Sequence, residues 1–155
     1  MLSAPPRQIR RAAAAASPPS KHVCFRVGSW RFALAVDEIL GLYTGLPLIP
    51  STDLRCSGLV QLPQGRVPVI DLRAPAHQSP ILPALALVEN HGQSVALAFD
   101  FADEVLPVQA RGWIAHNLEA CPLPARGRTI TRHGDVFWLN VHDLMSRMSA
   151  RSMEN

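Results

Sequence analysis

The sequence is poor in the residues that crosslink small domains or build metal and redox centres. It has three cysteines, Cys24, Cys56 and Cys121, which are widely spaced and never form a C-x-x-C pair. An odd, scattered set of this kind indicates neither a disulfide framework nor a zinc site, and it fits a reducing compartment. Long apolar runs are also missing, because charges or prolines interrupt every apolar segment before it reaches the length of a membrane span. We therefore expect a cytoplasmic protein with no direct membrane insertion.

Motifs of known catalytic chemistry are missing too. There is no G-x-G-x-x-G or G-x-x-x-x-G-K-[ST] phosphate loop, no G-x-S-x-G nucleophile elbow and no H-E-x-x-H zinc motif. The six histidines are scattered, so a metal site, the less favoured alternative, would need ligands that only the fold brings together. Cys56 is interpreted as core filler rather than as a reactive thiol. We predict no enzyme, no catalytic residues, no metal and no cofactor.

Positive charge is concentrated at the start of the chain and not in its body. The net charge is +3, but four basic residues, Arg7, Arg10, Arg11 and Lys21, precede residue 22, and from there 11 basic residues face 12 acidic ones. A domain that binds nucleic acid would carry clustered Lys and Arg on its folded part. We therefore expect no nucleic-acid partner. Residues 1–20, rich in Ala, Pro and Arg, are predicted to be a disordered tail that acts as a spacer.

The remaining chain is a series of short apolar strands separated by turn residues. A single helix is predicted to open at Val141, the segment from Val36 to Leu40 fits a helical turn or a strand, and residues 109–128 look irregular. This pattern predicts an all-β barrel or sandwich at residues 21–150, followed by a frayed end at 151–155. The predicted strands or strand pairs are 22–35 with a turn at 28–29, 58–72 with a turn at 63–66, 81–101 with a turn at 90–92, 103–108, and 129–141 with a turn at 133–135.

Asp71 stands out because it lies inside an apolar strand, between Ile70 and Leu72. An ionised carboxylate is costly to bury without partners, so it should accept hydrogen bonds from backbone N–H groups or from an arginine such as Arg73. The sequence leaves two roles open, pinning a turn and contacting a partner. A catalytic role is disfavoured, because no second carboxylate or base is positioned beside it.

The segment Val67 to Arg73 reads V-P-V-I-D-L-R, which resembles the signature strand of the CheW-like family. Gly58 stands where the same strand pair opens in that family. Further pieces follow in the family's order and extend the match over about residues 22–147. They are Phe25 and Gly28, the segment 32–34, V-x-E-I at 36–39, the strands 85–88 and 95–100, the D-E-V at 103–105, and the last strand at 134–141 with Leu144.

This resemblance implies an all-β fold of two intertwined, small SH3-like β-barrels with a short C-terminal helix. It also implies a non-catalytic adaptor that joins the cytoplasmic tip of a chemoreceptor to the regulatory domain of a CheA-type histidine kinase, at membrane-associated receptor arrays. Pro68, Asp71, Leu72 and Arg73 would form the structural signature and shape the binding surface from beneath. The partner-binding residues that it implies are Val36, Glu38, Gly58, Leu62, Pro63 and Arg66.

One departure from the family pattern concerns the turn before the signature strand. The family's N-L-R-G is replaced here by Gln61-Leu62-Pro63-Gln64, and Gly65-Arg66 offers a shifted substitute for the missing Arg and Gly. The change allows an altered partner choice. Two alternative functions therefore stay open: a divergent array component without kinase coupling, and a small β-barrel that binds a small ligand.

Overall fold

A computed structural model of the chain describes residues 20–53 and 55–154, with side chains described as far as residue 148. The secondary structure of this part is mostly β. The 3-10 helices are η1 (Val36–Glu38), η2 (Pro75–His77) and η3 (Ala110–Gly112), and the α-helix is α2 (Val141–Glu154). The strands are β1 (Ser20–Val27), β2 (Trp30–Ala35), β3 (Ile39–Tyr43), β4 (Leu46–Pro47), β5 (Gly58–Leu62), β6 (Gly65–Asp71), β7 (Ile81–Leu82), β8 (Ala84–Asn90), β9 (Gln93–Phe99), β10 (Phe101–Val108), β11 (Ala125–Thr131) and β12 (Gly134–Leu139).

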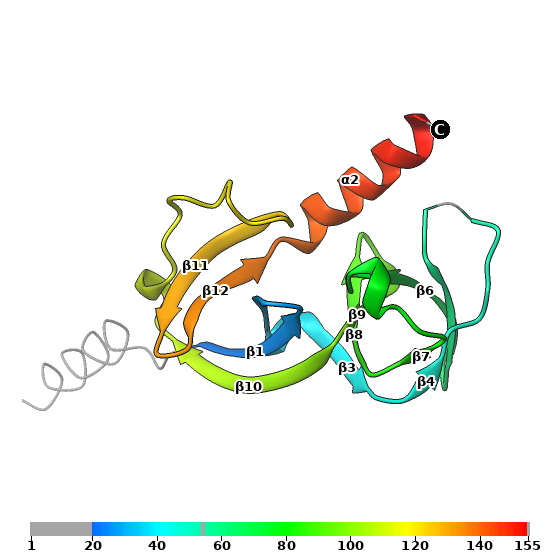
Figure 1. Ribbon diagram of the computed structural model, residues 1–155, viewed down its shortest axis with the longest axis horizontal. Coiled ribbons are helices and arrows are strands. Elements are labelled where there is room, and N and C mark those ends of the chain that lie inside the picture. The colour runs from blue at the N-terminus through cyan, green and yellow to red at the C-terminus, as the bar shows by residue number, and fades with distance from the viewer. Residues whose placement is uncertain (1–19, 54, 155) are drawn as a thin grey trace, which may run out of the picture.

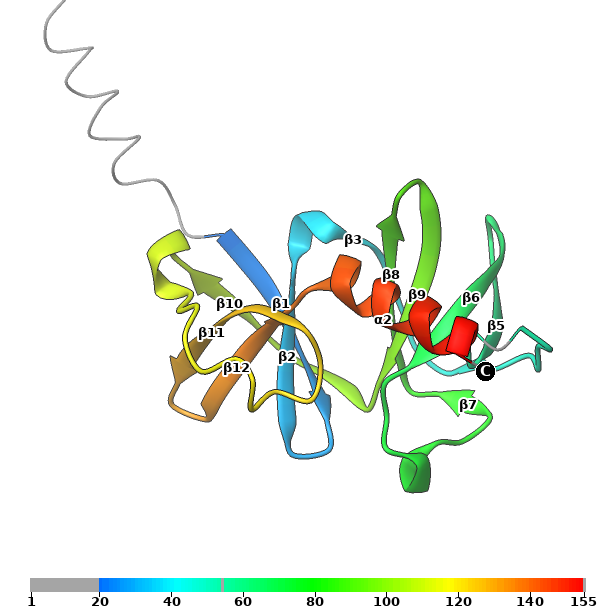
Figure 2. The same ribbon diagram turned by 90° about the horizontal axis from the view of Figure 1, so that it is seen from above.

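Two five-stranded sheets form the body, and the chain passes between them twice. The first sheet has the order β10-β1-β2-β12-β11 and the second has the order β3-β8-β9-β6-β5, while β4 and β7 form a small third sheet. The chain leaves the first sheet after β2, builds the second and returns at β10. The two subdomains named here after their sheets are therefore intertwined, and they lie next to each other below α2 (Figures 1 and 2).

Closed barrels are not confirmed by the hydrogen bonding. In the described residues the first sheet ends at β10 and β11 and the second ends at β3 and β5, and neither pair of edge strands is joined into a ring. An isolated bridge between Ile49 and Leu59 only partly covers the outer edge of β5. The mostly β fold with one C-terminal helix is as predicted, but the sheets are open.

The central strands are buried on both faces, which explains their nearly continuous hydrophobicity. On β8, Ala86 and Val88 face a large core shared by the two subdomains, whereas Leu85 and Leu87 fill the interior of the second subdomain. A smaller cluster around Cys24 fills the interior of the first subdomain. The fold is therefore stabilised by three apolar layers, the middle one being common to both sheets.

Local turn chemistry sets the predicted hairpins. The β1–β2 pair turns at Gly28, whose φ of 60° suits glycine, and the β8–β9 pair turns at His91 and Gly92, both with positive φ. Residues 36–40 contain both of the predicted structures, a helical turn at η1 and the start of a strand at β3. The strand predicted at 103–108 begins earlier, at Phe101, because β10 pairs along the length of β1.

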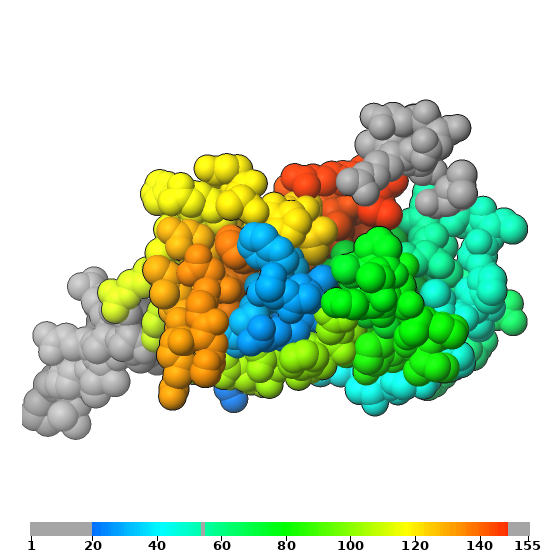
Figure 3. All heavy atoms as spheres, in the orientation of Figure 1, coloured from blue at the N-terminus to red at the C-terminus, as the bar shows by residue number. Residues whose placement is uncertain are grey.

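The division of the chain into tail, domain and frayed end stays a prediction. Residues 1–19 lie outside the described residues, and Ser20, the last residue of the predicted tail, is the first of β1. The helical backbone of α2 continues to Glu154, into the segment that was expected to fray. In the space-filling view, α2 lies above the junction of the two subdomains, beside the loop before β11 (Figure 3).

Gly58 allows a close approach between two backbone segments. A Cβ at this position would lie 2.7 Å from the carbonyl oxygen of Ile49 and 2.8 Å from Leu48 Cδ1. The backbone atoms of Ile49 and Leu59 exchange hydrogen bonds of 2.7 Å beside it. The closeness leaves no room for a side chain.

We therefore expect Gly58→Ala to lower the free energy of unfolding by about 1–3 kcal/mol, the usual cost of an overpacked interior. Urea unfolding followed by tryptophan fluorescence measures this loss. Gln64→Ala, at an exposed turn, is the matched control and should unfold like the wild type. An unchanged midpoint for Gly58→Ala would show that the 48–49 segment moves away freely.

Candidate functional site

The first crossing between the subdomains exposes a row of apolar side chains. Val36 on η1 is 43% exposed, and Leu40 and Leu42 on β3 are 54% and 50% exposed. Glu38 holds this segment in place, because its Oε1 accepts hydrogen bonds from the backbone N–H of Ala35 at 2.9 Å and from Trp138 Nε1 at 2.7 Å. The apolar residues Val36, Leu40 and Leu42, here called the crossing surface, are thus presented on an anchored backbone.

A hollow of about 650 Å³ adjoins η1. The rings of His22 and Trp138 lie 4.6 Å apart between centroids, and a second indole, Trp113, lies 4.8 Å from His22. The residues that line the hollow beside η1 are Ser20, Lys21, His22, Ala35, Val36, Asp37 and Trp138. The crossing surface therefore borders a concave site with an aromatic floor.

His22 is a buried polar residue in that floor, with a relative exposure of 1%. Within the described part of the chain, neither of its ring nitrogens makes a hydrogen bond of standard geometry. Burial lowers the pKa of His22, and the Ser20 carbonyl and the carboxylates of Glu38 and Asp37 oppose that shift only in part. The ring is therefore neutral at neutral pH.

The β5–β6 hairpin holds the second group of predicted partner-binding residues. Pro63 is exposed in its turn and Arg66 is exposed on β6 close to the turn, in accord with a surface role. Leu62 is only 3% exposed and packs in the interior of the second subdomain, so its side chain is not offered to a partner. Gly58 is also buried and acts through the close backbone approach described above. The partner-binding role of the whole set stays a prediction.

The structure separates these residues into two surfaces. Val36 and Glu38 precede β3, which is one edge of the second sheet, and Pro63 follows β5, which is the opposite edge. Three strands lie between the two edges. The exposed hairpin residues Pro63 and Arg66 are here called the hairpin surface. This surface and the crossing surface can therefore be occupied independently.

Asp71 and Arg73 form a buried ion pair at the end of β6. Their side chains are each 2% exposed, and Asp71 accepts hydrogen bonds from Arg73 Nη2 at 2.8 Å and from Arg73 Nε at 2.9 Å. The predicted acceptor role of Asp71 is confirmed. The same guanidinium donates to the backbone carbonyl of His77 and to both the Oγ and the carbonyl of Ser79, so the pair pins the loop that contains η2.

The other two signature residues lie beside this pair. Pro68 pairs with Leu59 across the β5–β6 hairpin, and Leu72 packs against the shared core. Both are half-buried. A shaping role for these two residues stays a prediction.

The interior of the first subdomain contains a polar cluster that the sequence analysis missed. Arg31, 3% exposed, donates to Asp103 at 2.9 Å, to Glu104 at 2.6 Å and to Thr131 Oγ1 at 3.0 Å. These contacts join β2, β10 and the end of β11. The sequence offered two signals, an arginine among the apolar residues of β2 and two adjacent acids more than seventy positions further along the chain.

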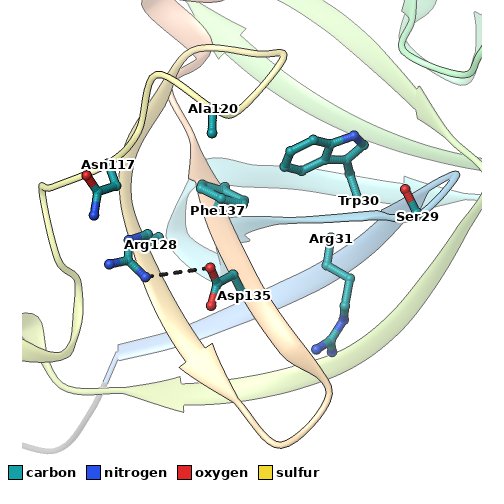
Figure 4. Close-up of a pocket in the computed structure, with 8 residues that line it drawn as sticks. All are labelled: Ser29, Trp30, Arg31, Asn117, Ala120, Arg128, Asp135 and Phe137. Carbon is teal, nitrogen blue, oxygen red and sulfur yellow. Dashed lines mark ion pairs between the residues drawn. The ribbon is translucent and has the colours of Figure 1, made fainter.

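The hollow drawn in Figure 4 lies at the same end of the first subdomain. Trp30 and Phe137 line it with ring centroids 5.6 Å apart, and Arg128 and Asp135 approach to 3.6 Å at its rim. In this view the guanidinium of Arg31 points away from the two aromatic rings. The charged groups of this hollow are paired: Arg128 with Asp135 at its rim, and Arg31 with Asp103 and Glu104.

Among the side chains described at 20–53 and 55–148, no three His, Cys, Asp or Glu residues are grouped as ligands for a metal ion. No helix found in the described part of the chain has both the length and the apolar character needed to cross a membrane.

Comparison with known proteins gives a structural relationship only. No protein-family model and no curated protein sequence matches the chain. Among solved structures, the scaffolding protein TtCheW from Thermoanaerobacter tengcongensis superposes with a TM-score of 0.67 and 22% identity, over 81% of this chain and 92% of that one. The chain has the CheW-like fold. The match spans nearly the whole neighbour, so the CheW-like fold includes both subdomains and not one of them alone.

Within the CheW-like fold, the Asp71–Arg73 pair should contribute strongly to stability. Removing one partner of a buried ion pair leaves the other charge uncompensated, at a cost of about 3–5 kcal/mol. We expect Asp71→Ala to lower the free energy of unfolding by that amount in urea. Asp53→Ala is a matched control, since Asp53 pairs with Arg55 at the same spacing but in solvent, and it should change little. Equal losses in both variants would contradict the assignment.

His22 predicts a pH dependence with a definite sign. Its pKa in the folded state lies below the ordinary value of 6.5, so below that pH the unfolded chain binds a proton that the native state does not. Stability is therefore full above about pH 6.5 and falls as the pH is lowered. We expect His22→Phe, which keeps the ring between Trp113 and Trp138, to reduce this fall between about pH 7.5 and 5.5. The same fall in both proteins, measured by urea unfolding, would contradict it.

Proposed function

We propose that the protein is a non-catalytic chemosensory adaptor, which couples chemoreceptors to a CheA-type histidine kinase at cytoplasmic, membrane-associated arrays. The observation that carries this proposal is the CheW-like fold over both subdomains, shared with a neighbour described as a scaffolding protein. The ordered sequence pieces, from the V-x-E-I at 36–39 to the V-P-V-I-D-L-R at 67–73, support the same reading. An adaptor needs docking surfaces rather than reacting groups.

Two separate surfaces suit a protein that holds two partners at once. The crossing surface and the hairpin surface lie at opposite edges of the second sheet, so one partner need not displace the other. Both are supported from within, the first by the contact between Glu38 and Trp138 and the second by the buried leucine at position 62. Rigid presentation lowers the entropic cost of binding.

The crossing surface suits the helical tip of a chemoreceptor. Val36, Leu40 and Leu42 expose apolar area. The charged residues Lys21 and Asp37 line the adjoining hollow, and Glu38 is occupied by its two hydrogen bonds. A helix binds such a surface by burying an apolar stripe. A modest, transient interface is sufficient for a signalling contact.

The hairpin surface suits the regulatory domain of the kinase. β5 is an edge strand, and an edge can pair with a strand of a second β domain. Arg66 lies beside this edge with its side chain exposed and takes part in none of the ion pairs found among the described side chains. It can replace the arginine that the family carries in the preceding turn, with a shifted contact.

Calorimetric titration against two purified partners tests both assignments. The partners are the regulatory domain of the CheA-type kinase and a chemoreceptor fragment that contains the cytoplasmic tip, both from the same organism. We expect Val36→Asp to weaken receptor binding and Arg66→Glu to weaken kinase binding, each by about ten-fold or more, as for central contacts of an interface. Each variant should leave the other partner's affinity nearly unchanged.

Ile130→Asp is the matched control. Ile130 is 66% exposed on β11, an edge of the first sheet. Like Val36→Asp, the substitution adds one negative charge at an exposed apolar position, but away from both proposed contacts. Its affinities should equal those of the wild type. Absence of binding to any kinase or receptor of that organism would overturn the adaptor function, and equal effects of all three variants would overturn the two surfaces.

A further inference from the structure

His91 and His142 come together on the surface from distant parts of the chain. His91 lies in the β8–β9 turn and His142 in the first turn of α2, 51 positions apart. The Nε2 atom of His91 lies 3.0 Å from the Nδ1 atom of His142, and the ring planes meet at 76° with centroids 4.8 Å apart. Both residues are exposed. Two imidazole nitrogens thus face each other where solvent has access.

We infer that these two histidines form a binding site for a divalent first-row transition-metal ion. Imidazole nitrogens bind such ions at about 2.0–2.1 Å, so nitrogens 3.0 Å apart subtend about 91–97° at a shared ion. That angle suits adjacent positions in the square or octahedral coordination of Ni²⁺ and Cu²⁺. Tetrahedral Zn²⁺ needs a separation of about 3.3 Å, which a small side-chain rotation supplies.

The protonation states required are accessible to both rings. In the hydrogen-bonded pair, one of the two facing nitrogens carries the proton. Binding needs that ring to adopt its other tautomer, with the N–H of each ring directed outward. Because both side chains are exposed, water can accept these outward hydrogens and fill the remaining coordination positions. No third side chain is required for a site of modest affinity.

The position of the site gives the bound ion a mechanical effect. The second subdomain supplies His91 and the helix supplies His142, so an ion joins α2 to the β8–β9 hairpin. A ligand that binds only the native pair raises the stability of the fold in proportion to its saturation. The inference does not depend on the proposed adaptor function, because neither histidine belongs to the crossing surface or the hairpin surface.

Titration of the full chain with NiCl₂ tests the site. The protein must carry no polyhistidine tag, and Ni²⁺ is preferred to Cu²⁺ because three free thiols are present. We expect one Ni²⁺ per chain and a rise of the melting temperature with metal. His91→Asn and His142→Asn should each weaken binding by about ten-fold or more and abolish the rise. Asn suits position 91, where φ is 52°.

Two further variants make the result decisive. The double variant His91→Asn/His142→Asn should bind no more weakly than either single variant, because one imidazole alone does not chelate. His133→Asn, at the β11–β12 turn, removes an exposed histidine elsewhere and should bind like the wild type. Wild-type affinity in the His91 or His142 variant, or an equal rise of the melting temperature in it, would overturn the inference and leave the pair as a hydrogen bond only.

Discussion

The packing of the two sheets on each other is the constraint on which the rest of the structure depends. Phe25 of β1 stacks on Phe99 of β9 with ring centroids 4.2 Å apart and an interplanar angle of 16°, at the centre of the shared core. Each ring belongs to a different sheet. Each sheet covers the apolar face that the other sheet turns toward the shared core. Neither subdomain can therefore bury this face alone. The two subdomains are therefore expected to fold as one cooperative unit.

The shared core also decides where the chain can offer apolar surface. Because the central strands are buried on both faces, exposed apolar residues are left to the segments at the sheet edges and to those that pass between the sheets. Val36, Leu40 and Leu42 lie on the first crossing, and Phe101 and Val105 lie on β10, the returning strand. An intertwined topology thus creates docking area near the junction of the subdomains, without exposing the core itself.

Local chemistry made much of the fold predictable from the sequence, and distant pairing did not. The hairpins follow from turns such as Gly28 and from alternating apolar residues. The parallel pairs β2–β12 and β6–β9, which join the hairpins into the two sheets, bring together strands far apart in the chain, and no local pattern marks them.

Among the candidate site residues, the ion pair of Asp71 with Arg73 joins residues two positions apart, and the sequence predicts it. The contact of Glu38 with Trp138 spans 100 positions and was not. Leu62, predicted to contact a partner, shares the buried face of β5 with Val60, so its side chain points inward.

The interior of the first subdomain shows how a small β domain accommodates polar groups at its two ends. At one end, Arg31 has acidic partners on β10 and a hydroxyl on β11, so its buried charge is compensated and the three strands are held in register. At the other end, His22 has rings on two sides but no comparable hydrogen bonds among the described residues, which favours its neutral form. The compensated end is suited to rigidity. The uncompensated end borders η1 and the crossing surface, because His22 and Val36 line the same hollow.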